Sequence, residues 1–240
     1  TAQRLLLGRG GDNTEALAAI ASGDNTVAAL QAIWTLRGRG ELQRKLVMKI
    51  ARLDDTQRQI QALRAGRSLL SAADLVTLYE ELSPDSADVL SMQLAFAMGD
   101  HASDASARRS LVTLLTANLE SPYIRQAVVR AVAGEELLFL REYLGSEHLG
   151  AVSEAARTVL SSLASGAYRS LRGDITSGES ANPALLELLA LAESRSNDNA
   201  WQQMAMLEGM KSVAASTDFV PAVLEASPEI FSDGSISEQD

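Results

Sequence analysis

Cysteine is absent from this chain of 240 residues, which excludes disulfide bonds, thiolate metal sites and a cysteine nucleophile within it. Histidine is almost as scarce. His101 and His148 lie 47 positions apart, and neither has the second histidine three or four positions away that a helical metal pair requires. We therefore expect both histidines to lie on the surface, in loops between helices.

Aromatic residues make up only 4% of the chain, and there are five prolines. No segment shows the apolar and polar alternation of a half-buried strand. No apolar run approaches the roughly 18 residues that a membrane-spanning helix needs, so we expect no transmembrane segment. What the chain does have is a hydrophobic fraction of 46%, dominated by Ala and Leu. Small and medium apolar side chains suit close packing between helices, so the composition predicts an all-α fold with a substantial core.

Motifs for catalysis or cofactor binding are also lacking. The segments GRGGDN (8–13) and GRGE (38–41) have neither the third glycine of a dinucleotide-binding loop nor the Gly-Lys-Ser/Thr ending of a phosphate-binding loop. No G-x-S-x-G segment marks a nucleophilic serine. Adjacent acids such as Glu80 and Glu81 diverge by about 100° on a helix and do not converge on a substrate. We predict no catalytic, cofactor-binding or metal-binding residue, and no cofactor.

An enzyme stays open as an alternative. The helices within 68–160 are rich in Asp and Glu, and they would then line a groove that acts on a cationic or sugar substrate. Such an enzyme requires two carboxylates about 5–10 Å apart in a cleft, whereas a scaffold does not.

Charge is distributed unevenly. The net charge of -10 argues against general nucleic-acid binding, which relies on a basic footprint. Residues 37–67 nevertheless hold nine Lys and Arg against three acids, whereas 68–240 hold ten basic and 25 acidic residues. Solvated outer helix faces are one explanation for the basic segment. The other is a patch that docks an acidic protein neighbour, with Arg37, Arg39, Arg44, Lys45, Lys49 and Arg52 as its candidate residues.

Apolar residues recur at helical spacing through most of the chain, and short polar or Gly/Pro clusters separate segments of 10–16 residues. Four of these segments are alike, each apolar in its middle and closed by a glycine: Gly38, Gly66, Gly99 and Gly134. The steps of 28, 33 and 35 residues match one two-helix repeat. We expect these glycines to adopt the left-handed conformation that ends helices.

The repeats predict four parts of the chain. A HEAT-like stack covers 1–164, a Gly/Ser-rich linker or flexible loop 165–182, further helical repeats 183–225, and a flexible acidic tail 226–240. A glycine-closed copy, WQQMAMLEGM, recurs at 201–210. Trp34 and Trp201 fall on apolar helix faces, and we predict both to be core residues. Because the chain opens at Thr1 in a segment that already reads as helix, we expect it to be a piece of a longer protein.

Five segments together resemble a known family: AQRLLLGRGG (2–11), LQAIWTLRGRGEL (30–42), MQLAFAMGD (92–100), ESPYIRQAVV (120–129) and WQQMAMLEGM (201–210). In this order they resemble the HEAT-like region of bacterial multidomain proteins described as membrane-bound dehydrogenases with a C-terminal haem-c domain. In that family a sorbosone-dehydrogenase-like propeller precedes the helical repeats, and a cytochrome-c domain with a C-x-x-C-H site follows them.

The resemblance implies a periplasmic or extracellular setting and a redox parent protein. It transfers no functional residue, because this chain contains neither the propeller nor a C-x-x-C-H segment. The sequence as a whole predicts an all-α, HEAT-like α-α superhelix that acts as a non-catalytic scaffold. Its expected partners are proteins or neighbouring domains of a longer chain, and not nucleic acid. A stand-alone adaptor that binds a protein or peptide is the alternative.

Overall fold

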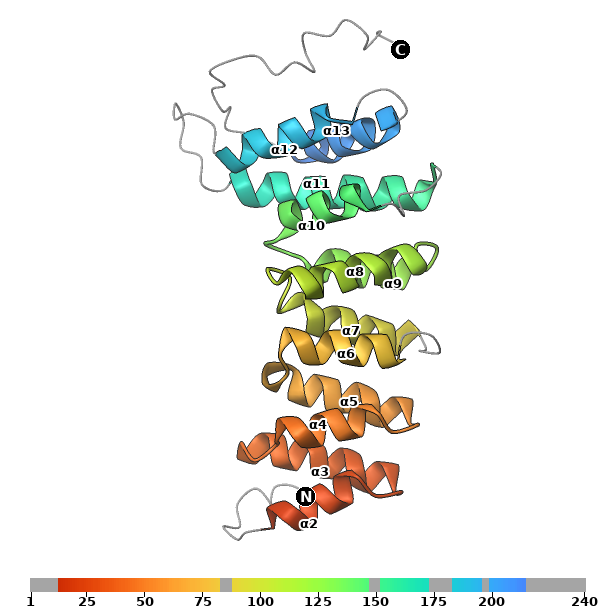
Figure 1. Ribbon diagram of the computed structural model, residues 1–240, viewed down its shortest axis with the longest axis vertical. Coiled ribbons are helices and arrows are strands. Elements are labelled where there is room, and N and C mark those ends of the chain that lie inside the picture. Colours follow the sequence, from red (N-terminus) through yellow and green to blue (C-terminus); the bar gives the residue numbers. More distant parts are fainter. Residues whose placement is uncertain (1–12, 83–87, 147–151, 173–182, 196–198, 215–240) are drawn as a thin grey trace, which may run out of the picture. The chain divides into compact units, whose positions relative to one another are not determined.

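The computed structural model describes residues 13–82, 88–146, 152–172, 183–195 and 199–214. Helices make up 81% of these residues, and none of them lies in a strand. The predicted all-α fold is therefore confirmed. The chain forms two compact units, and Figure 1 labels their helices. Unit 1 comprises Thr1–Asn118 with Gln126–Ala131, and unit 2 comprises Leu119–Arg125 with Val132–Asp240.

Unit 1 contains seven complete described α-helices, a short 3-10 helix and the end of another α-helix. They are α2 (Thr14–Ala21), α3 (Thr26–Arg39), α4 (Arg44–Ala51), α5 (Thr56–Gly66), η1 (Arg67–Leu69), α6 (Ala72–Leu82), α7 (Asp88–Gly99), α8 (Ala105–Ala117) and the last residues of α9 (Pro122–Ala131). Unit 2 contains the first residues of α9, then α10 (Glu136–Gly145), α11 (Glu154–Arg172), α12 (Pro183–Glu193) and α13 (Ala200–Ala214).

Short polar residues fix where several of these helices begin. The side chain of Asn25 accepts a hydrogen bond from the Ala28 amide and caps α3. Asp55 caps α5 in the same way, and Asp104 caps α8 by accepting from two backbone amides. Each cap satisfies amides of the first turn, which have no partner inside the helix.

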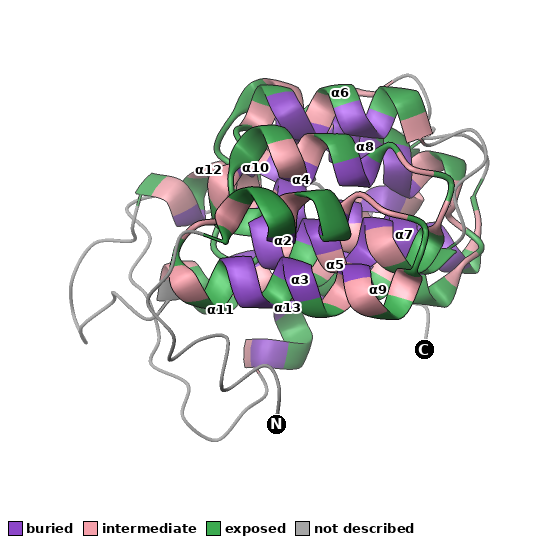
Figure 2. Ribbon diagram, turned by 90° about the horizontal axis from the view of Figure 1, so that it is seen from below, coloured by how far each residue is buried: buried purple, intermediate pink, exposed green. Residues whose placement is uncertain are grey.

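The helices of unit 1 form two layers. Consecutive helices pair, α2 with α3, α4 with α5 and α6 with α7. The second helix of each pair packs on the second helix of the next, α3 on α5 and α5 on α7, while α4 packs on α6 and α6 on α8. Figure 2 shows the first helices α2, α4, α6 and α8 on one side of this unit and the second helices α3, α5 and α7 on the other. The core lies between the layers.

Burial shows the register of the repeat. The buried residues of α3 end at Leu36, those of α5 at Gly66 and those of α7 at Met98, in steps of 30 and 32 residues. All five buried positions of α3 recur in α5 at the 30-residue step. These steps differ from the 28 and 33 residues predicted from the glycines, because Gly66 is equivalent to Leu36 and Met98 and not to the neighbouring glycines.

The predicted left-handed conformation is wrong for three of those four glycines, Gly38, Gly66 and Gly99. Gly134 has the left-handed φ of 91°, whereas α3 is closed by Gly40, with φ 73°, and Gly38 lies inside that helix. Gly66 and Gly99 are helical and serve close packing instead. A Cβ on Gly66 would lie 2.5 Å from both Cγ atoms of Val47, and one on Gly99 would lie 2.9 Å from the carbonyl carbon of Ala131.

Unit 2 is built around α11, which packs against α10, α12 and α13. Its core includes the stacked rings of Phe139 and Tyr143, whose centroids are 6.2 Å apart. Burial raises the pKa of Tyr143 to about 12. Gly209 of α13 lies against α11, where an added Cβ would be 2.8 Å from the carbonyl carbon of Ser161.

The predicted linker needs correction at its start. Helix α11 continues to Arg172, so residues 165–172 are helical and only 173–182 lie outside the described residues. The glycine at 166, which suggested a loop, instead makes room for the buried Glu136, since a Cβ there would lie 2.8 Å from its Oε1 atom. Helices α12 and α13 occupy the predicted segment 183–225 as far as Ala214, and the tail 226–240 is outside the described residues.

Candidate interaction surface

The six residues of the predicted docking patch lie on the C-terminal half of α3 and on α4 with its C-cap. Half of them bind acids within unit 1: Arg39 pairs with Glu41, Arg44 with Asp74, and Arg52 with Glu81. The other half, Arg37, Lys45 and Lys49, are exposed and form no ion pair with the described residues. The docking patch stays a prediction, and only three of its six cations have no ion pair with the described residues.

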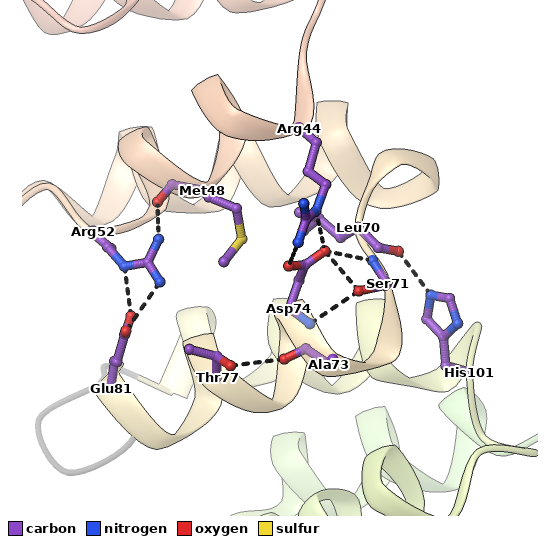
Figure 3. Close-up of polar contacts among 10 residues, drawn as sticks. All are labelled: Arg44, Met48, Arg52, Leu70, Ser71, Ala73, Asp74, Thr77, Glu81 and His101. Carbon is purple, nitrogen blue, oxygen red and sulfur yellow. Dashed lines mark hydrogen bonds and ion pairs between the residues drawn. The ribbon is translucent and has the colours of Figure 1, made fainter.

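Asp74 is the most constrained acid of this region (Figure 3). Its side chain is 5% exposed and accepts from the Arg44 guanidinium of α4. It also accepts from the Ser71 amide at 2.9 Å, while the Ser71 hydroxyl accepts from the Asp74 amide at 3.3 Å. This reciprocal pair is a capping box at the start of α6. Hydrogen bonding to Arg44 and Ser71 holds the pKa of Asp74 well below its usual range.

Other polar contacts link residues about one repeat apart. Arg52 Nε donates to Glu81 at 2.7 Å (Figure 3), and Arg67 donates to the two carboxylate oxygens of Asp100 from Nε and from one terminal nitrogen. His101 lies in the turn after α7, as predicted for a loop residue, but its Nε2 atom is 3.1 Å from the carbonyl oxygen of Leu70. This histidine therefore joins two repeats, and His148 lies outside the described residues.

Acids of the first repeats are held in the same manner. Thr26 donates to Asp55 at 2.7 Å across 29 positions, and this bond, together with those from Arg58, lowers the pKa of Asp55. Hydrogen bonds from Arg39 and Thr14 lower the pKa of Glu41. The acids that the enzyme alternative would use, including Asp74, Glu81 and Asp100, are thus engaged in contacts between repeats.

The second-helix face of unit 1 has a different chemistry. We use this name for the outward side of α3, α5, η1 and α7, with Gln31, Trp34, Arg37, Gln61, Arg64, Arg67, Gln93 and Phe96 as its residues. The 30- and 32-residue steps place three glutamines at one equivalent position and Trp34, Arg64 and Phe96 at another, three residues later. Trp34 is 40% exposed, so its predicted place in the core is wrong.

Two hydrogen bonds connect neighbouring helices on this face. Trp34 Nε1 donates to Gln61 Oε1 at 3.1 Å, and Arg64 Nε donates to Gln93 Oε1 at 2.9 Å. Indole and guanidinium nitrogens can only donate, so each glutamine must turn its oxygen toward them. The amide nitrogens of Gln61 and Gln93 then face elsewhere, and they have no hydrogen-bond partner among the described residues.

A half-open pocket lies on the same face, between α5 and α7. It has a volume of about 250 Å³ and is lined by Leu63, Arg64, Arg67, Gln93, Phe96 and Ala97. Pockets that enclose small-molecule ligands are usually about 300–1,000 Å³, so this one is better suited to a single side chain of a protein. Its lining combines an apolar floor with the donors of two arginines.

Sequence reasoning missed this face. The signal was present as Q-A-I-W, Q-A-L-R and Q-L-A-F at the equivalent positions 31–34, 61–64 and 93–96. The match is hidden when Gly38, Gly66 and Gly99 are taken as equivalent, because their spacing differs from the 30- and 32-residue register of the helices. In the part of the chain that the structure describes, no group of three or more His, Asp or Glu residues is arranged to hold a metal ion. None of the helices in that part is both long enough and apolar enough to cross a membrane.

Comparison with known proteins returns no match. No protein family, no curated protein and no solved structure is found to be similar to this chain. The resemblance to the HEAT-like region of the haem-c dehydrogenases therefore stays a prediction from the five segments that carry it.

Proposed function

We propose that this chain is a non-catalytic, HEAT-like helical-repeat module that binds a protein through the second-helix face of unit 1. The observation that carries the proposal is the combination found there: a 40% exposed tryptophan, a pocket for one side chain, and amide donors that have no partner among the described residues. Tryptophan and arginine are enriched where protein interfaces are strongest. The two-layer packing within unit 1 supports the superhelical architecture, because stacked repeats leave long continuous faces exposed.

Charged residues elsewhere in unit 1 support the same assignment by contrast. Arg44 and Arg52 are held by acids of the next repeat, and Arg58 is held by the helix cap Asp55. Their charges stabilise the stack and leave little unpaired chemistry for a substrate. The module is therefore better suited to holding a partner than to transforming one.

Site-specific photo-crosslinking tests this proposal. A benzophenone amino acid replaces Phe96 on the second-helix face, and a matched control carries it at the exposed Thr77 of α6, in the first-helix layer. In cells that make the protein naturally, we expect one discrete protein adduct from position 96 and none from position 77. Equal labelling from both positions, or labelling from position 77 alone, would contradict the proposed surface.

The periplasmic or extracellular setting and the redox parent protein are part of this proposal and rest on the resemblance alone. Their test is the intact mass of the native polypeptide that contains this segment, with a visible absorption spectrum of the same sample. A much larger chain with the Soret band of a c-type haem is the expected result. A colourless polypeptide of about this length would remove the redox parent and leave a stand-alone adaptor.

A further inference from the structure

We infer that the occupant of the second-helix face is an extended, acidic segment of the partner protein, an inference that rests on the proposed function. The first reason is the polarity of the hydrogen-bonding groups. The bonds from Trp34 and Arg64 occupy the oxygens of Gln61 and Gln93 and leave their amide nitrogens to donate. A surface that presents donors is complementary to backbone carbonyl oxygens and to carboxylates.

The second reason is charge. Arg37 is exposed and has no ion pair among the described residues, and Arg64 binds only the neutral Gln93 there. Arg64 uses its Nε for that bond and keeps four further N–H donors in a fork that fits a carboxylate. Although the whole chain carries a net charge of -10, this face therefore offers two cations that no carboxylate of the described residues neutralises.

The third reason is spacing. Packed helices lie roughly 8–10 Å apart, and an extended chain in the polyproline II conformation advances about 3.1 Å per residue and presents every third side chain to the same side. Consecutive glutamines of the face are therefore matched by every third residue of an extended segment that crosses the helices. Between them, the pocket lined by Leu63, Phe96 and Ala97 accepts one apolar side chain. The expected ligand is an extended segment with an acid at about every third position and an apolar residue between acids.

The experiment begins with a random peptide library displayed against the full chain. We expect enrichment in Asp and Glu with an intervening Leu, Ile or Phe. The best peptide and its variant with every Asp and Glu replaced by the corresponding amide are then compared by fluorescence anisotropy. The acidic form is expected to bind at least about tenfold more tightly, the usual effect of one hydrogen bond between charged groups. Equal binding of the two forms would overturn the inference.

Variants of the chain sharpen the test. Gln61→Glu and Gln93→Glu keep an oxygen for Trp34 and Arg64 but replace the donor amide with an anionic oxygen. Each variant is expected to weaken binding of the acidic peptide about tenfold, while the thermal unfolding temperature is unchanged. Arg64→Gln should weaken binding of the peptide to a similar extent. The control Arg109→Gln, which replaces an exposed arginine of α8, should leave the affinity unchanged. Affinities that do not respond to the three face variants would overturn the inference.

The outcomes separate this inference from the function on which it rests. Selected peptides that lack acids but lose affinity in Trp34→Ala would overturn the acidic ligand and keep the face as a protein-binding surface. Selected peptides whose affinity is unchanged by Trp34→Ala and by the three face variants would overturn both the acidic ligand and the proposed binding face. A labelled oligothymidylate that binds with the same dependence on Arg64 would show recognition of any polyanion, and it would overturn the acidic peptide as the ligand.

Discussion

At the scale of single residues, glycines in this protein matter mainly because they lack a side chain. Gly66, Gly99 and Gly209 are helical, and an added Cβ at each would collide with a neighbouring helix. Two of these collisions are with backbone atoms, of Ala131 and Ser161, which cannot rotate away. Close approach of helices, and not only chain reversal, therefore explains why glycine recurs in the second helices.

Replacing Gly209 tests this explanation. Helix propensity alone would make Gly209→Ala stabilising by about 1 kcal/mol. Overpacking against Ser161 of α11 opposes it, and we expect Gly209→Ala to lower the free energy of unfolding by about 1–3 kcal/mol in urea titrations. The matched control is Gly145→Ala, also in unit 2, where an added Cβ meets nothing within 4 Å. Equal stability changes in the two variants would contradict the packing role.

The capping box of Asp74 should make the free energy of unfolding depend on pH. Because Asp74 is buried and bonded to Arg44 and Ser71, its pKa is depressed in the folded chain. A depressed pKa contributes stability above the unfolded value of about 3.9, and the contribution is lost as pH falls toward the folded value. Asp74→Asn is therefore expected to lower the free energy of unfolding by about 1–3 kcal/mol at neutral pH, and the difference from wild type should shrink below about pH 4.

Urea unfolding of wild type and variant from pH 7 down to pH 3 measures this difference. The control is Glu81→Gln, which removes the acid of α6 that binds Arg52 at the C-cap of α4. Glu81 and Arg52 are 42% and 40% exposed, so solvent screens their pair and little stability should be lost. A pH-independent deficit in Asp74→Asn would mean that the residue acts by shape and not by charge.

At the scale of helices, sequence periodicity predicts the number of residues per repeat and most helix positions. It does not predict which side of an apolar helix faces outward. Helix α3 has apolar residues on several sides, and Trp34 lies outward only because Ala29, Ile33 and Leu36 already fill the interface with its neighbours. The contacts between repeats were likewise hidden, since they join residues that become neighbours only after stacking.

Composition misled the prediction at α11 for a similar reason. Gly and Ser near position 166 are typical of a linker, yet the helix continues there, and Gly166 leaves the space that the buried side chain of Glu136 occupies. Local sequence carries no sign of that distant side chain. The ion pairs of unit 1 could not be predicted for the same reason. The basic segment is visible in the sequence, but the pairing of Arg44, Arg52 and Arg67 with acids 29–33 positions later is not.

Helix stacking predicts a gradient of local stability in unit 1. Helix α5 packs on α3, α4 and α7, whereas α2 has extensive contacts with α3 alone among the described helices. Amides of α5 should therefore exchange with solvent more slowly than those of α2. Hydrogen exchange followed by mass spectrometry on the full chain measures both helices in one experiment. Equal protection of α2 and α5 would contradict the packing described for this unit.

At the scale of the whole molecule, the chain divides its charges between two roles. Three arginines of unit 1, Arg44, Arg52 and Arg67, bind acids of the next repeat and stabilise the stack, while the second-helix face keeps donors and cations for a partner. The net charge of -10 limits binding of nucleic acids and favours recognition that depends on a local surface. This division is the basis for proposing a scaffold that holds an acidic segment.

Hydrogen exchange of the full chain, with and without the best acidic peptide from the library, tests the central claim most directly. The account predicts slower exchange on binding in α3, α5 and α7, because the peptide crosses these helices, and unchanged exchange in α4, α6 and α8. Protection confined to the first helices, or no helix protected at saturating peptide, would contradict the assignment of the second-helix face as the binding surface.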